Sequence, residues 1–172
     1  MIIPRWLTFT ILVLITSIST AENKLTIQEI IKNDIWALAE GTDSSNATVI
    51  RFRSEFGNKP NITGYPHLIQ ITWSYTSSSS GMPDKLASEK MSVFEDRLIN
   101  AVEPDINAVL VAVRTNGGER VWVFYSSNVR EFGNRLTQMP QEKERYPIGL
   151  TTKEDPEWSF FYNIILPGVS SG

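Results

Sequence analysis

The sequence has no cysteine and only one histidine, and these two shortages exclude several kinds of chemistry. Without cysteine there can be no disulfide, no thiolate zinc site and no cysteine nucleophile. With His67 as the sole histidine, a histidine-based metal site would have to take its other ligands from carboxylates. The sequence also lacks a Gly-x-Ser-x-Gly elbow, a phosphate-binding loop and an Asp-x-Asp-x-Asp calcium loop. We therefore predict neither a metal nor a cofactor.

Positive charge is scarce as well. The 172 residues include 16 Lys and Arg against 19 Asp and Glu, which gives a net charge of −3. Proteins that bind nucleic acid need clustered basic side chains for the phosphates, so we expect no nucleic-acid partner. The length suits one domain, and a chain of this size can bury enough surface to be stable without disulfides.

Long apolar runs are absent, with one exception at the N-terminus. Arg5 precedes an uncharged apolar run at residues 6–18, and Ser19-Thr20-Ala21 then places small residues at positions −3 and −1 of a cut after Ala21. This is the three-part pattern of a secretory signal peptide, and the run is shorter than the about 20 residues that span a bilayer. We predict that residues 1–21 are removed on export to the periplasm or the outside of the cell. The alternative is an uncleaved N-terminal anchor.

The N-terminal half of the remaining chain reads as a short helix or linker followed by strands. Residues 22–33 are the helix or linker, and strands are expected at residues 35–40, Ala47–Phe56 and His67–Tyr75. In the last of these, apolar and polar side chains alternate in the manner of a strand with one buried face.

The C-terminal half alternates helices and strands. Helices are predicted from Asp84 to Glu103, over Asn128–Met139, and from Asp155-Pro156 to a stop at Pro167-Gly168; strands are predicted at Ala108–Thr115, Arg120–Ser126 and Tyr146–Thr152. Ala108–Thr115 is apolar on both faces and should be an interior strand. Asn116-Gly117 is a strong hairpin signal.

This order of elements predicts an α+β fold. From Ile69 onward it is β-α-β-β-α-β, the split βαβ or ferredoxin-like arrangement, with an added N-terminal β-hairpin and a C-terminal helix that caps the sheet. We place the single domain at residues 34–167 and a tail at residues 168–172.

Several short sequence segments occur in the same order as similar segments of a known family. They are Trp36-Ala37-Leu38-Ala39-Glu40, Tyr65-Pro66, Trp73-Ser74-Tyr75, Gly81-Met82-Pro83, Phe94-Glu95-Asp96, Thr115–Arg120 with Trp122 and Phe124-Tyr125, and Asp155-Pro156-Glu157-Trp158 with Tyr162. Together they resemble the bacterial family called domain of unknown function 695, across nearly the whole mature chain. That family has no established activity, and it looks similar to the regulator of ribonuclease activity B family of small inhibitor domains. The resemblance therefore implies a protein-binding role and assigns no catalytic residue.

The residues that could carry chemistry also have ordinary structural explanations. His67 begins a strand, and Glu154-Asp155 suits a helix cap better than catalysis. Glu95 and Asp96 lie on the long helix beside Arg97, which is typical of a solvated helix face. We predict no catalytic residue.

The tryptophans offer a second candidate site. Trp36, Trp73, Trp122 and Trp158 are expected to be core residues, but an aromatic platform on an open sheet face is the alternative. In Arg120–Ser126, Val121, Val123 and Tyr125 share one face, and Trp122 and Phe124 share the other. We predict that the C-terminal helix covers the Trp122 face, and we take Trp122, Phe124, Trp158 and Tyr162 as candidate binding residues.

The function that these patterns favour is a non-enzymatic binding or protein-interaction module. We expect its partner to be another envelope protein, with no nucleic acid bound and no membrane contact after signal cleavage. The alternative is a carboxylate-dependent hydrolase of the cell envelope, which would require two or more carboxylates converging in a cleft with raised pKa values. The sequence leaves the oligomeric state open.

Overall fold

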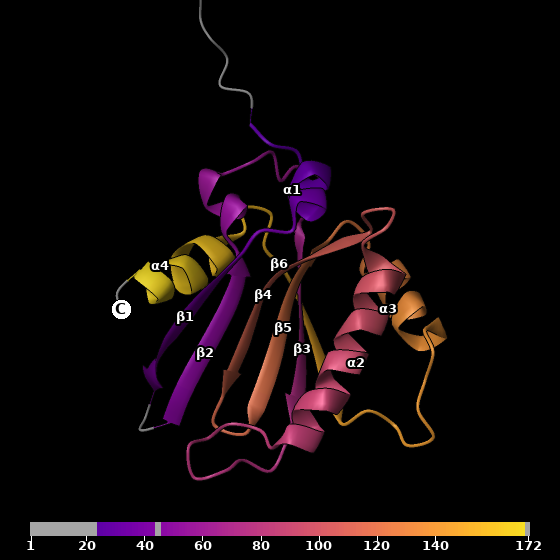
Figure 1. The fold of residues 1–172 in the computed structure, drawn as a ribbon. Helices are drawn as coiled ribbons and strands as arrows, with labels where there is room; N and C mark the ends of the chain where they lie inside the picture. Colours follow the sequence, from indigo (N-terminus) through magenta and orange to yellow (C-terminus); the bar gives the residue numbers. More distant parts are fainter. Residues whose placement is uncertain (1–23, 44–45, 171–172) are drawn as a thin grey trace, which may run out of the picture.

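The computed structural model describes residues 24–43 and 46–170 (Figure 1). The predicted signal peptide lies outside these residues. Within them, no helix is both long enough and apolar enough to cross a bilayer.

One six-stranded antiparallel sheet organises the protein. Its strands lie in the order β1-β2-β4-β5-β3-β6. Their bounds are β1 Trp36–Asp43, β2 Asn46–Arg53, β3 His67–Ser74, β4 Ala108–Asn116, β5 Glu119–Ser126 and β6 Ile148–Glu154. The predicted α+β class is confirmed, and β4 is an interior strand as its two apolar faces indicate. β4 and β5 are joined through Gly117 and Gly118, which both have positive φ, as a tight hairpin of this kind requires.

The helices begin where the sequence offers caps. They are α1 Ile27–Asn33, α2 Lys85–Val102, α3 Val129–Gln138 and α4 Leu166–Ser170, and a π-helical turn at Phe161–Ile165 leads into α4. Thr26 and Glu29 form a capping box on α1, Asp84 caps α2 and Asn128 caps α3. Within the segment predicted as a helix or linker, Ile27–Asn33 forms the helix α1, which buries Ile27 and Ile30 in the core.

Two hydrophobic cores lie on opposite faces of the sheet. On one face, α2 and α3 pack over alternate residues of β3, β4 and β5; the buried side chains there include Ile71, Trp73, Met91, Phe94, Leu98, Val113, Trp122, Phe124 and Phe132. On the other face, α1, the 3-10 helix Ser54–Asn58 and the C-terminal helix pack over the remaining set, which includes Phe56, Leu68, Val109, Val121, Val123, Tyr125, Trp158 and Phe161. Below, the first is called the α2 face.

The prediction that the C-terminal helix covers Trp122 and Phe124 is wrong. Both side chains are fully buried on the α2 face. Trp158 instead packs on the opposite face, where its ring is parallel to that of Tyr125 with the ring centroids 4.1 Å apart. The helix pair α2 and α3 already fills the Trp122 side, so the C-terminal helix covers the face that is left.

The C-terminal helix also begins and ends later than predicted. Pro156 and Glu157 form a turn, and Trp158 has a φ of 52° in the left-handed region. Asp155 still caps the helix, but it accepts the backbone N–H groups of Ser159 and Phe160 rather than starting a helix at Pro156. The helix runs on through Pro167 to Ser170. Pro167 is the second residue of α4, directly after the π-helical turn, and a proline is tolerated in the first turn of a helix.

Three strands differ from the prediction by more than one residue at an end. β1 continues to Asp43 instead of ending at residue 40, because residues 41–43 still pair with β2. β2 ends at Arg53, because the chain turns into a 3-10 helix that buries Phe56 against Trp158, with ring centroids 5.2 Å apart. β6 spans Ile148–Glu154 rather than Tyr146–Thr152. Pro147 has no N–H for a sheet ladder, and Tyr146 packs against Trp73 and Phe94 instead.

Candidate functional site

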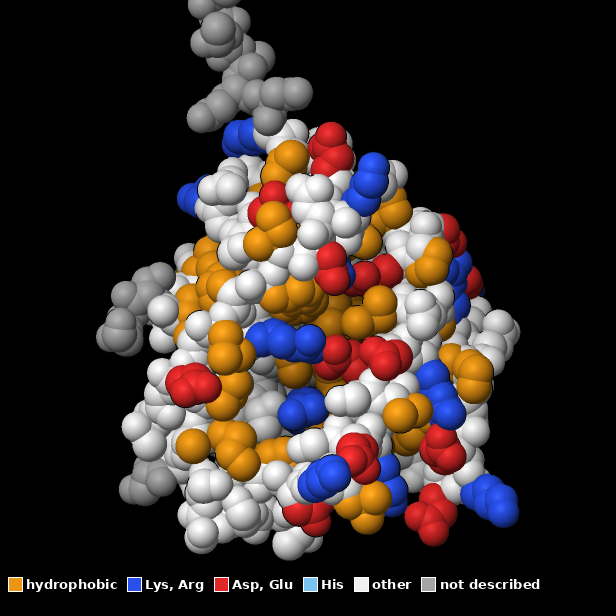
Figure 2. Space-filling view, in the orientation of Figure 1, with side chains coloured by type: hydrophobic (Ala, Val, Ile, Leu, Met, Phe, Trp, Pro, Cys, Tyr) orange, Lys and Arg blue, Asp and Glu red, His pale blue; other side chains and the backbone are white. Residues whose placement is uncertain are grey.

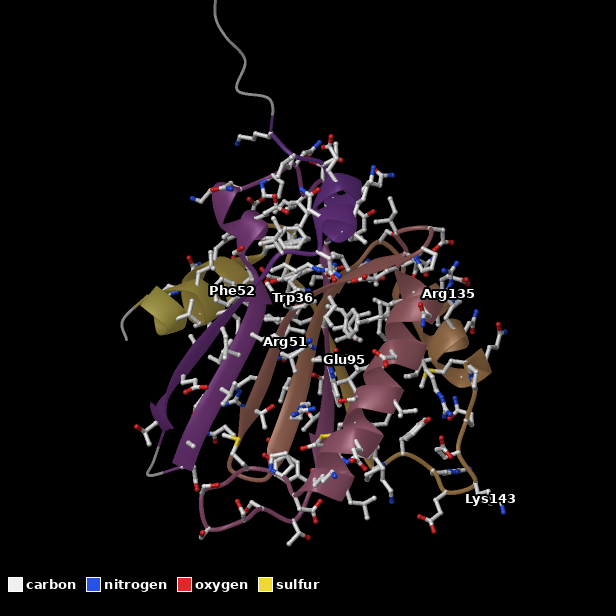
Figure 3. The ribbon with its side chains drawn as sticks, viewed as in Figure 1. Trp36, Arg51, Phe52, Glu95, Arg135 and Lys143 are labelled. Carbon is white, nitrogen blue, oxygen red and sulfur yellow. The ribbon has the colours of Figure 1, made fainter. Side chains whose placement is uncertain are left out.

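Two arginines of β2 reach across the α2 face to two glutamates of α2. Arg51 and Arg53 are two residues apart, so strand alternation places both side chains on the same face. Glu95 and Glu103 lie eight residues apart on α2 and its C-cap. Figure 3 shows Arg51 and Glu95 directed toward each other between the strand and the helix. We call these four residues, the residues that they contact and the neighbouring pair Thr115 and Arg120 the β2–α2 cluster.

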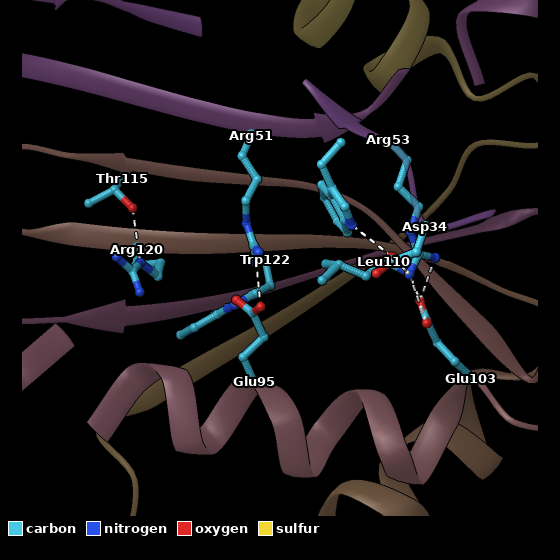
Figure 4. A network of polar contacts seen from close by, with 10 residues as sticks. Asp34, Arg51, Arg53, Glu95, Glu103, Leu110, Thr115, Arg120 and Trp122 are labelled. Carbon is cyan, nitrogen blue, oxygen red and sulfur yellow. Dashed lines mark hydrogen bonds and ion pairs between the residues drawn. The ribbon is translucent and has the colours of Figure 1, made fainter. Parts of the chain in front are cut away.

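The half of the cluster nearest α1 is closed. Arg53 and Glu103 are 3% and 5% exposed, and two hydrogen bonds of 2.9 and 3.0 Å join them (Figure 4). Glu103 also accepts the backbone N–H of Leu110 at 2.8 Å, beside the β-bulge in β4. Asp34 adds a contact of 3.2 Å to Arg53. This paired, buried arrangement is typical of an ion pair that has a structural role and joins two elements of the fold.

The other half of the cluster is open to solvent. Arg51 is 37% exposed and forms an ion pair with Glu95, which is 12% exposed. The second oxygen of Glu95 accepts the indole N–H of Trp122 at 2.6 Å. Trp36 is partly exposed, and the guanidinium carbons of Arg51 and Arg53 lie 4.7 and 5.0 Å from its ring centroid. Such distances are within the range of cation–π interactions.

Arg120 lies in the floor of the open half. Its Nε–H donates to the hydroxyl of Thr115 at 2.9 Å. Within the described part of the chain, no Asp or Glu forms an ion pair with its guanidinium; Glu95 and Arg51 act on it only at longer range. Burial holds the pKa of Arg120 below its ordinary value. The open half therefore combines two arginines with one carboxylate.

Strand register shows how this half is built. One cross-strand row on the α2 face runs Leu38, Arg51, Val113, Trp122, Ile71, Leu150. The next row runs Glu40, Val49, Thr115, Arg120, Trp73, Ile148. α2 covers the middle of these rows and leaves the β1 end bare, so Leu38 is 62% exposed. Figure 2 shows basic and acidic side chains adjoining near the centre of this face.

The four candidate binding residues from the sequence do not form one surface. Trp122 and Phe124 are fully buried on the α2 face, and Trp158 is fully buried on the opposite face. Tyr162 is partly exposed; its hydroxyl donates to the carbonyl of Phe56, and burial raises its pKa to about 12. Only Trp122 belongs to the β2–α2 cluster, through its indole N–H.

Three grooves mark the surface elsewhere. The largest, about 930 Å³, lies between the first turns of α2 and residues 142–147, and it includes Tyr75. A second of about 570 Å³ separates the C-terminal helix from β3 and β6, and a third of about 310 Å³ lies between α1 and the end of α2. None of the four candidate binding residues lines any of the three.

Three described carboxylates, Glu29, Asp105 and Asp155, have a shifted pKa, and all three shifts are downward. No group of three or more described Asp, Glu or His side chains could hold a metal ion. Burial would raise the pKa of Asp155, but hydrogen bonds from Tyr125, Phe160 and Ser159 outweigh it and leave that pKa below its ordinary value. Hydrogen bonds to Thr26 lower the pKa of Glu29, and Arg135 lowers that of Asp105. A general acid would need the opposite shift.

The cluster was only partly visible in the sequence. The prediction that Glu95 lies on a solvated helix face is wrong, because Arg51 and Trp122 bind both of its oxygens. The alternation of Arg51 and Arg53 with Ile50 and Phe52 did place both arginines on one face. No local pattern indicates which helix that face meets. Several of the short sequence segments that resemble the family nevertheless contribute residues to this region. These residues are Trp36, Tyr75, Glu95, Thr115, Arg120 and Trp122.

Comparison with known proteins identifies a family and nothing closer. Neither the curated proteins nor the solved structures contain a match to this chain. Residues 34–166 match the sequence model of a family described as "Family of unknown function (DUF695)". This match spans most of the 172 residues and includes every strand of the sheet. The chain therefore belongs to the family of unknown function DUF695.

Proposed function

We propose that this protein is an exported, non-enzymatic binding module and that the open half of the β2–α2 cluster is its binding site. The partner that we propose is another protein of the cell envelope. The observation that carries the proposal is the partial exposure of the side chains there. Trp36, Arg51 and Arg120 are all partly exposed, and they are held over a floor of sheet residues that are otherwise buried.

Three features support binding over catalysis. The carboxylate in the open half, Glu95, has both oxygens engaged in holding neighbouring side chains, one by Arg51 and one by Trp122. Arginine and tryptophan are the residue types that most often dominate binding energy at protein interfaces. The family resemblance to small inhibitor domains points to the same role. Export is supported by the signal-peptide pattern of residues 1–21.

We also propose that the part of the sheet without its N-terminal hairpin is a ferredoxin-like domain. Its strands lie in the order β4-β5-β3-β6, with α2 and α3 packed on one face, and this order supports the split βαβ arrangement. On this view the β1–β2 hairpin is an addition to that unit. It extends the sheet past α2 and supplies Trp36, Leu38 and Arg51 to the site.

Site-specific photo-crosslinking in the cells that make the protein tests the proposed binding site. A photoreactive residue at Leu38 should give a covalent adduct of defined mass, because this exposed side chain borders the open half. Leu150 is a matched control, since it is an exposed leucine in the same cross-strand row at the opposite edge of the sheet. We expect an adduct at position 38 and none at position 150. Equal labelling at the two positions, or none at either, contradicts the proposal.

A further inference from the structure

The open half of the β2–α2 cluster has an unbalanced positive charge. Among the described residues that interact with Arg120 through charge, it holds Arg51 and one carboxylate, Glu95; the exposed Glu40 lies on the same face at the outer β1 edge. Both oxygens of Glu95 are in use, one by Arg51 and one by Trp122. In the closed half, by contrast, one arginine, Arg53, faces two carboxylates, Glu103 and Asp34. The excess of positive charge is therefore confined to the part of the cluster that solvent can reach.

Arg120 is the group that lacks compensation. Its guanidinium is half-buried between Thr115 and Trp73 in the cross-strand row, and only its Nε–H has a hydrogen-bond partner among the described residues. Withdrawing a charge from water is unfavourable when its counter-charge, here Glu95, acts only at longer range, and burial accordingly lowers the pKa of this group. Its remaining N–H donors form a planar fork, the geometry that matches two oxygens of an anion.

The neighbours of Arg120 suit a bound anion. Thr115 fixes the Nε side of the guanidinium, which leaves the terminal nitrogens for a ligand. Arg51 provides a second positive charge at the β2 side, and its orientation is set by Glu95 and by the ring of Trp36. Tyr75, whose hydroxyl donates to the carbonyl of Gly81 at 2.9 Å, adjoins Arg120 and also lines the groove of about 930 Å³.

We propose that Arg120 and Arg51 together form a binding site for an oxyanion, a carboxylate or phosphate group, carried by the ligand of this protein. This inference rests on the proposed function and names the chemistry that the site recognises. Arg120 makes the primary contact, and Arg51 contributes a second one from the opposite side. Glu95 limits the affinity, because its negative charge opposes the incoming anion while it holds Arg51 in position.

Nuclear magnetic resonance of arginine side-chain Nε–H groups tests this directly. The folded protein is titrated with inorganic phosphate and, separately, with glutarate, and sodium chloride at equal ionic strength serves as the reference. We expect saturable shifts of the Arg120 signal with at least one of the two anions, and the comparison tells phosphate from carboxylate recognition. Shifts that match those in chloride, or that do not saturate, overturn the inference.

Three variants separate a binding role from a structural one. Arg120→Gln should weaken anion binding about 10-fold or more, as loss of a charged hydrogen-bond pair does. Arg114→Gln is the matched control and should leave affinity unchanged, because Arg114 is also partly exposed but lies on the other sheet face. Glu95→Gln should tighten binding by about 3- to 10-fold, since it removes the one opposing charge.

The outcomes distinguish this inference from the proposed function. Equal loss in the Arg114 and Arg120 variants would indicate nonspecific charge attraction and overturns the inference. Unchanged or weaker binding in Glu95→Gln refutes the opposing role given to Glu95. Urea melts confirm that each variant is folded. If no anion binds but the Leu38 adduct forms and survives in Arg120→Gln, the proposed function stands and the oxyanion site does not.

Discussion

Replacing Arg53 with methionine should destabilise the protein far more than the same change at Arg51. Arg53 is 3% exposed, and methionine would leave the buried carboxylate of Glu103 without its cation. Breaking a buried ion pair from one side costs about 3–5 kcal/mol. Arg51 is 37% exposed, and exposed pairs contribute about 1 kcal/mol or less. The two arginines lie on one strand and one face, so each is the control for the other.

Urea denaturation followed by tryptophan fluorescence measures both losses. With a urea slope of about 1–3 kcal/mol per molar, the Arg53→Met variant should lose roughly 2 M in its unfolding midpoint, while Arg51→Met should lose well under 1 M. Unchanged slopes would show that the native and denatured states keep their compactness.

A double variant isolates the pair itself. Arg53→Met with Glu103→Gln removes both charges but keeps an oxygen that can accept the Leu110 N–H. The double variant should therefore be more stable than the sum of the two single losses predicts, by more than about 1 kcal/mol. Glu103→Gln alone should cost less than Arg53→Met, because Asp34 still contacts Arg53 at 3.2 Å. Equal losses for Arg51→Met and Arg53→Met, or strict additivity in the cycle, would refute the division into a closed and an open half.

Further predictions concern other parts of the molecule. Trp158→Ala should cost about 3–5 kcal/mol in urea melts, because the ring is fully buried against Tyr125; an unchanged midpoint would contradict the packing role. The lowered pKa of Asp155 stabilises the fold above about pH 4, so the advantage of wild type over Asp155→Asn should shrink as the pH falls below that value, which thermal melts can follow. Amides of β4 should be among the slowest to exchange with deuterium, and fast exchange there would argue against its interior position. Intact-mass measurement of the exported protein should give a chain that begins at Glu22; a chain that retains residues 1–21 in the membrane fraction would refute cleavage.

The fold was largely predictable because its elements carry local signals. Alternation in β3, the Asp84 cap of α2 and the glycine turn after Asn116 each depend on residues close in sequence. The C-terminal helix was placed on the wrong face for a different reason. Its apolar stripe indicates that Trp158 is buried. Which of the two apolar faces of β5 the C-terminal helix covers, however, depends on where α2 and α3 pack. Periodicity within one segment does not contain that information.

The candidate site was less predictable, since it is assembled from β1, β2, α2, β4 and β5. Arg51 and Glu95 are 44 positions apart, and Arg120 comes from β5, which is not a neighbour of β2 in the sheet. Aromatic residues drew the prediction toward Trp122, Phe124 and Trp158, which are buried. A surface arginine and a surface glutamate, by contrast, look like ordinary solvated residues until the sheet and helix bring them together. What marks the site is an excess of positive charge among residues that are close together only in the folded protein. No single stretch of the sequence shows this excess.

The two halves of the cluster have complementary physical properties. The closed half ties β2 to the end of α2 through a buried ion pair, and the same carboxylate fixes the β4 backbone at Leu110. This tie limits how far β2 and α2 can move apart, and it therefore holds Arg51 within reach of Glu95. An anion that enters the open half would meet arginines already oriented by Trp36 and Thr115, so little conformational entropy would be lost on binding. Because the whole chain carries a net charge of −3, attraction for an anion must come from this local arrangement rather than from the overall field of the protein.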